Sequence, residues 1–348
     1  MKASLQSLLG SGACALLLFL TIPSALAAGA YHLVTEIPVG GEGGWDYLSI
    51  DEGARRLYVS HATKVVVIDI EKNVIAGEIA DTPGVHGVAL APELKRGFTS
   101  NGRENKSSIV DLATLKTLTK VDTGANPDAM LFEPGRQEVY MFNGRGQSAT
   151  VFAAGSGQVL ATIPLGGKPE FAVADSTAGR VYVNIEDKNE VVAIDTATHA
   201  IVAHWPIAPG EEASGLAIDV ARHRLFLGCG GTNLMVMMDS ATGKVVASVP
   251  IGQGVDATAF DPGTQLAFSS NGEGTVTIAR EETPDKLTVV QTLATERSAR
   301  TMTLDPKTHR IYLASAKFEP QPEVAAGAPR QRPKMIPGSM KILVYGLE

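Results

Sequence analysis

The feature that most constrains the fold of this sequence is a unit of about 42 residues that occurs seven times. The copies align without gaps over two short apolar runs, and the residue that ends the first run serves as a reference position. The seven reference residues are Asp51, Ala91, Glu133, Asp175, Asp219, Asp261 and Asp305. An aromatic residue stands seven places after each of them. Self-similarity at this period is typical of architectures in which neighbouring repeats share a core.

Each unit reads as four short strands. The two apolar runs flank a polar turn, which predicts an antiparallel hairpin. Four units continue with a third run that ends in an aspartate, and a further apolar run follows. We expect these aspartates to form Asx turns; they are Asp69, Asp111, Asp195 and Asp239. Four strands in about 42 residues match a propeller blade, so the sequence predicts an all-β, seven-bladed β-propeller with four-stranded blades.

The two ends of the repeat array predict how the ring closes. Residues 31 to 39, YHLVTEIPV, precede the first complete unit and resemble the fourth strand of the other units, whereas the last unit ends at its third strand, KILVYGLE. An open ring would leave two sheet edges exposed. We therefore predict that the N-terminal strand completes the seventh blade, and that residues 28 to 348 form one domain.

Residues 1 to 27 have the order of a secretory signal peptide: a positive charge at Lys2, an apolar stretch, and small residues at Ala25 and Ala27. We expect cleavage after Ala27 and a periplasmic or secreted protein. Removal of this segment leaves Cys229 as the single cysteine, which excludes an intrachain disulfide. No later apolar run reaches the length of about 18 residues that a membrane span needs.

Several phrases resemble a known family. RLYVSHATKVVVIDIEKN and GRVYVNIEDKNEVVAIDTATH, with the proline-led NPDAMLFEP and KPEFAVAD, are similar to the repeats of YncE-like, YVTN-type propellers. The resemblance covers nearly all of the chain after the signal peptide. It implies a seven-bladed, typically exported propeller. It implies no single activity, because the family includes varied binding proteins.

Polar residues stand five places before every reference residue, where the innermost strand begins. They are Asp46, His86, Asp128, Glu170, Ser214, Asp256 and Arg300. We expect these side chains to surround the mouth of the central channel, above an apolar plug three places before the reference. His86, within the apolar stretch PGVHGVALAP, then belongs to this ring rather than to the core. The structural alternative is that the acids cap local backbone groups and that Arg300 neutralises Asp256 and Asp46.

The ring suits two kinds of ligand. His86, Asp128 and Glu170 offer one nitrogen and two carboxylates from adjacent blades, a set that suits Zn, Mn or Fe. His61 or Asp46 are possible additional ligands. Arg300 with Ser214 suits an anionic or hydroxylated ligand. Aromatic residues beside the ring are expected either to form a flat apolar wall or to pack in the core; they are Trp45, Tyr47 and Phe171.

A second set of residues stands ten places after each reference residue: His61, Asn101, Asn143, Ile185, Cys229, Asn271 and Ser315. The three asparagines each precede a glycine, which predicts turns with positive φ. His61 and Cys229 are not preferred turn residues. Cys229 is interpreted as a small filler or as a reactive thiol.

The last unit contains an insertion between its second and third strands, residues 316 to 340, with five prolines. Topology places it on the same face as the polar ring. Arg330, Arg332 and Lys334 make it basic, so it is either a lid over the acidic mouth or a tether without a role.

Charge and motifs narrow the function classes. A formal net charge of −7 argues against nucleic-acid binding. The sequence lacks G-x-S-x-G, H-E-x-x-H, C-x-x-C and phosphate-loop motifs. We expect a monomeric, exported binding protein whose partner is a small ligand or a protein, with a divalent metal ion as the candidate cofactor. The alternatives are a metal-assisted hydrolase or lyase that uses the same ring, and an envelope interaction scaffold.

Overall fold

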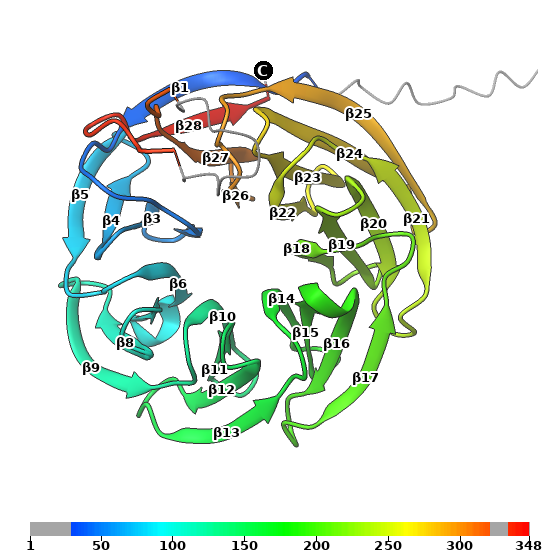
Figure 1. The fold of residues 1–348 in the computed structure, drawn as a ribbon, viewed down its shortest axis with the longest axis horizontal. Helices are drawn as coiled ribbons and strands as arrows, with labels where there is room; N and C mark the ends of the chain where they lie inside the picture. The colour runs from blue at the N-terminus through cyan, green and yellow to red at the C-terminus, as the bar shows by residue number, and fades with distance from the viewer. Residues whose placement is uncertain (1–28, 321–332, 348) are drawn as a thin grey trace, which may run out of the picture.

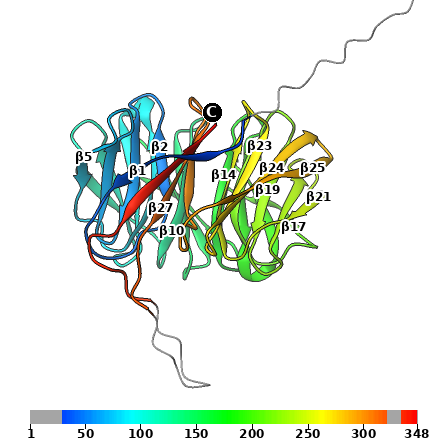
Figure 2. The same ribbon diagram turned by 90° about the horizontal axis from the view of Figure 1, so that it is seen from above.

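The computed structural model describes residues 29 to 320 and 333 to 347. These residues form seven four-stranded antiparallel sheets arranged around one central axis (Figure 1). Seen edge-on, the seven sheets make a single layer (Figure 2). The prediction of an all-β, seven-bladed propeller is therefore confirmed. Short 3₁₀ turns over Pro92–Leu94 and Glu186–Lys188 are the helical segments of the described chain.

The blades follow one another in sequence, each from its innermost to its outermost strand. Blade 1 contains β2 (Leu48–Asp51), β3 (Arg56–His61), β4 (Lys64–Asp69) and β5 (Val74–Ile79). Blade 2 contains β6 (Val85–Ala91), β7 (Arg96–Asn101), β8 (Lys106–Asp111) and β9 (Lys116–Asp122). Blade 3 contains β10 (Pro127–Glu133), β11 (Glu138–Asn143), β12 (Ser148–Ala153) and β13 (Val159–Pro164). Blade 4 contains β14 (Pro169–Asp175), β15 (Arg180–Ile185), β16 (Glu190–Asp195) and β17 (Ile201–Pro206).

The last three blades keep this plan, with one change in the seventh. Blade 5 contains β18 (Ala213–Asp219), β19 (Arg224–Cys229), β20 (Leu234–Asp239) and β21 (Val245–Pro250). Blade 6 contains β22 (Val255–Asp261), β23 (Leu266–Asn271), β24 (Thr275–Thr283) and β25 (Lys286–Ala294). Blade 7 contains β26 (Met302–Asp305), β27 (Arg310–Ser315), β28 (Lys341–Gly346) and, outermost, β1 (His32–Pro38).

The ring closes through β1, as the sequence predicts. This strand pairs antiparallel with β28 and runs along the outside of the seventh blade (Figure 1). An ion pair adds a second link between the first and last blades, because the half-buried Arg55 guanidinium lies 2.6 Å from the buried Asp305 carboxylate. The seventh sheet therefore has four strands like the others, and the edge of β28 is covered.

The core lies between neighbouring blades. The aromatic residue seven places after each reference position is almost fully buried in every blade: Tyr58, Phe98, Tyr140, Tyr182, Phe226, Phe268 and Tyr312. Around Tyr58, for example, Val65 and Val67 of blade 1 pack with Val85 and Val110 of blade 2. Because each aromatic side chain buries a large apolar area, the seven copies together stabilise the inter-blade contacts.

The aspartates that end the third strands form the predicted Asx turns. The Asp69 Oδ1 atom accepts hydrogen bonds from the backbone N–H groups two and three residues later, both at 3.0 Å. The same arrangement is found at Asp111, Asp195 and Asp239. These turns lie at the face opposite the polar ring.

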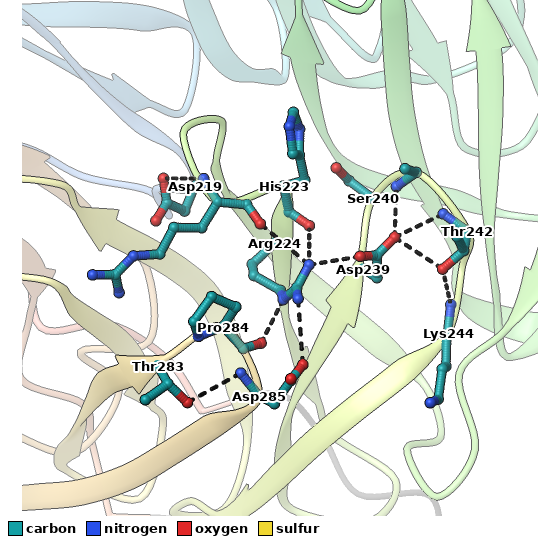
Figure 3. A network of polar contacts seen from close by, with 12 residues as sticks. Asp219, His223, Arg224, Asp239, Ser240, Thr242, Lys244, Thr283, Pro284 and Asp285 are labelled. Carbon is teal, nitrogen blue, oxygen red and sulfur yellow. Dashed lines mark hydrogen bonds and ion pairs between the residues drawn. The ribbon is translucent and has the colours of Figure 1, made fainter.

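Arginine links blades 5 and 6 at that same face (Figure 3). The buried Arg224 side chain lies 2.6 Å from Asp239 of its own blade. It also donates to the Pro284 carbonyl and lies 3.3 Å from Asp285, both in the turn between β24 and β25. One guanidinium therefore ties the Asx turn of blade 5 to the hairpin of blade 6.

Candidate site at the channel mouth

A repeated β-bulge displays the polar ring. In blade 2, Val85 pairs with Asn101 and Val88 pairs with Thr99, so two residues of β6 face one residue of β7. One of these two is His86, and the next N–H group, of Gly87, donates to Ser100 Oγ at 3.1 Å. Blades 3, 4, 5 and 6 have a similar shift in register near the start of the innermost strand, where this strand pairs with the second strand. A bulge changes the direction in which a side chain points. The residue at this position therefore does not have to pack among the apolar side chains between the blades.

We call the seven residues at this position the mouth. Three of them, from blades 1, 2 and 3, come together. His86 Nδ1 lies 2.7 Å from Asp46 Oδ2 and 3.3 Å from Asp128 Oδ1. One donor atom from each residue can be chosen so that all lie within 4.8 Å of one another. All three side chains are partly buried. One imidazole and two carboxylates at this spacing form a set that could hold a divalent metal ion.

Charge and burial shift the titration of this cluster. Burial disfavours a charged imidazole, but the hydrogen bond with Asp46 and the nearby carboxylates outweigh it and raise the pKa of His86. Burial also raises the pKa of Asp128 to about 6, against the opposing charge of His86. His86 and Asp128 therefore both hold a proton more strongly than the free side chains do. A bound cation would compete with those protons.

Glu170, the third ligand in the predicted metal set, has a different partner. Its carboxylate lies 2.6 Å from Lys168 Nζ, and Lys168 also contacts Glu186 in the same blade. Burial nevertheless raises the pKa of Glu170 to about 7. The set that converges is thus Asp46, His86 and Asp128. Lys168 escaped the sequence analysis, although the stretch Lys-Pro-Glu places it two residues before the ring position.

The remaining mouth residues lie in blades 5, 6 and 7. Arg300 Nε lies 3.3 Å from Asp256 Oδ2, which agrees with the expected neutralisation of Asp256. Asp46, the other acid assigned to Arg300, pairs with His86 instead. Burial raises the pKa of Asp256 to about 6. Ser214 is buried, and its carbonyl accepts a hydrogen bond from Asn184.

The aromatic residues near the mouth divide between the central axis and the rim. The Tyr47 and Phe171 rings pack edge to face with centroids 4.8 Å apart. Because they come from blades 1 and 4, which are not neighbours, this contact crosses the central axis. The Trp45 ring faces Phe318, in the stem of the insertion, with centroids 6.1 Å apart.

The residues ten places after the references do not line the mouth. All seven are buried, at the ends of the second strands. His61 faces backbone carbonyls, with Nε2 3.1 Å from the Gly40 carbonyl. Burial raises the pKa of the Cys229 thiol to about 12, which favours the small-filler interpretation over the reactive thiol.

The three Asn-Gly pairs do open turns, as predicted, but the predicted positive φ is wrong. None of the three asparagines, nor the glycine that follows, has a positive φ. Their amide groups instead donate to hydroxyl groups of the third strand, as Asn143 does to Ser148 and Thr150, both at 3.1 Å. Asn101 and Asn271 make equivalent bonds. These buried amides connect strands, which the Asn-Gly dipeptide does not reveal.

The described ends of the insertion form a stem beside the mouth. Phe318 and Met335 make an isolated antiparallel bridge, and Lys334 lies 3.7 Å from Glu319. The Gly338 N–H group donates to the Gly41 carbonyl at 2.8 Å, which fixes the stem to the loop before blade 1. Arg330 and Arg332, assigned to the basic lid, lie outside the described residues, so the lid stays a prediction.

A hollow that the sequence analysis missed lies between the loops of blades 2 and 3. It has a volume of about 350 Å³ and is lined by Gly102, Arg103, Asn105, Ala125, Asn126 and Arg145. The two arginines stand at the same repeat position, twelve places after Ala91 and Glu133. A comparison of that position across all seven units is the sequence signal that would have found them.

Comparisons with known proteins support the fold. No protein-family model matches the chain, and no curated protein does. Many solved chains share the fold, among them one in the structure described as "Crystal Structure of Mitotic Checkpoint Complex". It aligns with a TM-score of 0.73 and 13% identity over 90% of this chain and 95% of its own. In the described part of the protein, no helix is long and apolar enough to cross a membrane. At this identity the likeness shows the propeller fold alone.

Proposed function

We propose that this chain is an exported, YncE-like propeller that binds a divalent metal ion together with a small ligand at its mouth. The observation that carries the proposal is the convergence of Asp46, His86 and Asp128 from three successive blades, with donor atoms within 4.8 Å. The signal-peptide pattern of residues 1 to 27 supports export. Repeat phrases such as RLYVSHATKVVVIDIEKN support the family.

Three protein ligands leave coordination positions open on a Zn or Mn ion. In sites of this kind, water or part of a ligand takes the open positions. Asp46, His86 and Asp128 would hold the ion, while the Tyr47–Phe171 pair supplies an apolar floor across the axis. The ion would also relieve the repulsion between two carboxylates held close together.

A metal content measurement tests the proposal. The chain from residue 28 onward is purified, stripped with EDTA and titrated with Mn²⁺ or Zn²⁺ by calorimetry. We expect stoichiometric binding, and a loss of affinity of at least about tenfold in His86→Ala, because a ligand is removed. His204→Ala is the matched control, since His204 pairs with Glu190 at 2.9 Å on an outer strand far from the mouth. Absence of stoichiometric metal in wild type, with a wild-type melting temperature that no divalent ion changes, would contradict the proposal.

The second candidate function is a metal-assisted hydrolase or lyase. The pKa of Glu170, raised to about 7 by burial, suits a general acid or base at neutral pH. Its charge also contributes to the raised pKa of His86, so it acts close to the metal cluster. Metal-dependent turnover of phosphoester, carboxylic ester or lactone probes by the loaded protein would favour this function over binding alone.

A further inference from the structure

Two arginines without a carboxylate partner face the hollow between blades 2 and 3. Arg103 and Arg145 are exposed, and neither forms an ion pair within the described chain. Among the described residues, seven other arginines each have a carboxylate within 4.0 Å, and Arg56, Arg280, Arg297 and Arg310 do not. In a chain of net negative charge, two guanidinium groups at one hollow are a local reversal of charge.

The repeat makes this reversal specific to one place. The residues twelve places after the references are Thr63, Arg103, Arg145, Asp187, Gly231, Glu273 and Lys317. Only blades 2 and 3 present basic residues side by side at this position. Two like charges on adjacent loops repel each other, and an anion between them removes that repulsion.

The hollow shares a wall with the metal cluster. A Cβ atom placed on Gly102, which lines the hollow, would lie 2.7 Å from His86 Nε2. A Cβ atom placed on Gly144, in the next blade, would lie 3.8 Å from Asp128 Oδ2. Asn126 lies between these glycines, with its side-chain oxygen near the first and its nitrogen near the second. A ligand in the hollow is therefore adjacent to both His86 and Asp128.

We infer that this hollow binds the anionic group, a phosphate or a carboxylate, of the small ligand that the mouth takes. Guanidinium groups bind both anions with paired, charge-assisted hydrogen bonds. Asn126 offers an amide that makes no side-chain hydrogen bond among the described residues. The inference rests on the proposed function, because it assigns the anionic end of the ligand bound at that same site. A volume of about 350 Å³ suits a small molecule.

The double variant Arg103→Gln/Arg145→Gln tests the inference. Inorganic phosphate and acetate are titrated separately into metal-stripped and Mn²⁺-loaded protein at constant ionic strength. We expect the anion that binds wild type to lose at least about tenfold in affinity in the double variant. Arg297→Gln removes one charge from an exposed residue of the same face and is the control, expected to bind as wild type does.

The arms of the experiment separate the two proposals. Both are supported if the double variant keeps wild-type Mn²⁺ affinity and loses the anion. The inference is overturned if wild type binds Mn²⁺ but neither anion, or if the double variant binds the anion unchanged. Arginine-dependent anion binding by a protein that takes no Mn²⁺ would overturn the metal proposal and leave the anion site standing.

Discussion

The placement of His86 depends more on its neighbours than on its own chemistry. Val85 and Val88 are held in the blade by pairing with β7, so the chain between them bulges and turns His86 toward Asp46 and Asp128. Glycine then permits the close approach of the next loop, because Gly102 lies against the imidazole. At residue scale, the position of the His86 imidazole therefore depends on steric fit as well as on charge.

Gly102→Ala tests that fit without changing any charge. The new Cβ atom would lie 2.7 Å from His86 Nε2, so the imidazole must shift from the position in which it contacts Asp46 and Asp128. Gly102 does not have a positive φ, and alanine therefore adds no backbone strain. We expect Mn²⁺ affinity to fall by about tenfold, as when a supporting contact of a metal ligand is lost.

The control for this variant is Gly155→Ala. A Cβ atom on Gly155 would have no neighbour within 4 Å, and this glycine also lacks a positive φ. It should bind Mn²⁺ as wild type does. Equal affinities for wild type and Gly102→Ala, measured by calorimetry, would show that the imidazole does not bind the ion in this position.

At the scale of elements, sequence periodicity predicts the strands better than the site. The alternation of apolar residues predicts four strands per unit, and the third-strand aspartates predict their turns. The partner of each mouth residue depends on distances between blades, which periodicity does not contain. Lys168 takes Glu170 out of the predicted metal set, and Asp46 enters it. The positive φ predicted for the Asn-Gly pairs was wrong, and the buried amides bond to the third strand instead.

Blade 6 departs from the turn pattern, and the departure predicts a pH effect. Arg280 pairs with Leu266 at the position that an Asx aspartate takes in blades 1, 2, 4 and 5. Glu281 follows Arg280, and β24 continues past it to Thr283. Its carboxyl group is fully buried close to that of Asp219 in blade 5, with Arg222 at 3.6 Å. Burial, then the neighbouring Asp219 carboxyl group, raise the pKa of Glu281 from 4.5 to about 7. The charges of Arg222 and Arg224 oppose this rise.

The sign of the effect follows from linkage. The raised pKa means that the folded protein holds a proton that the unfolded chain releases. The contribution of this group is fully present below pH 4.5 and is lost as the pH rises through about 7. Glu281→Gln mimics the protonated acid and cannot ionise. We expect it to gain stability over wild type between these pH values, levelling at on the order of 3 kcal/mol.

Urea unfolding of both proteins from pH 4 to pH 9 measures this difference. EDTA in the buffer keeps metal binding at the mouth out of the comparison. Asp128, Asp256 and Glu170 also have raised pKa values, so wild-type stability alone does not identify Glu281. Parallel stability profiles for wild type and Glu281→Gln would contradict the assignment.

At the scale of the whole molecule, the ring depends on a strand from the opposite end of the sequence. β1 pairs with β28, and Tyr31 just before it packs on Phe268 of blade 6 and donates to the His309 carbonyl at 2.6 Å. Pairing of the two ends makes every blade a neighbour of two others. A break at this seam exposes the edge of β28 and the cores of blades 6 and 7. The closure was predictable because the missing fourth strand is visible in the sequence.

Two substitutions in β1 test this dependence. Ile37 is 1% exposed and Leu33 is 46% exposed, although both lie in the same strand. Ile37→Asp places a carboxylate in the apolar cluster beneath the seam, and we expect it to cost more than about 3 kcal/mol. Leu33→Asp makes the same chemical change in solvent and should cost less than about 1 kcal/mol.

The form of the unfolding transition distinguishes a closed ring from seven independent blades. If β1 holds the ring together, Ile37→Asp lowers the midpoint of a single cooperative transition, because the seam supports every inter-blade contact through its neighbours. If blade 7 unfolds by itself, calorimetry shows a small early transition followed by the wild-type one. A midpoint for Ile37→Asp equal to that of Leu33→Asp would mean that the ring stays closed without the buried face of β1.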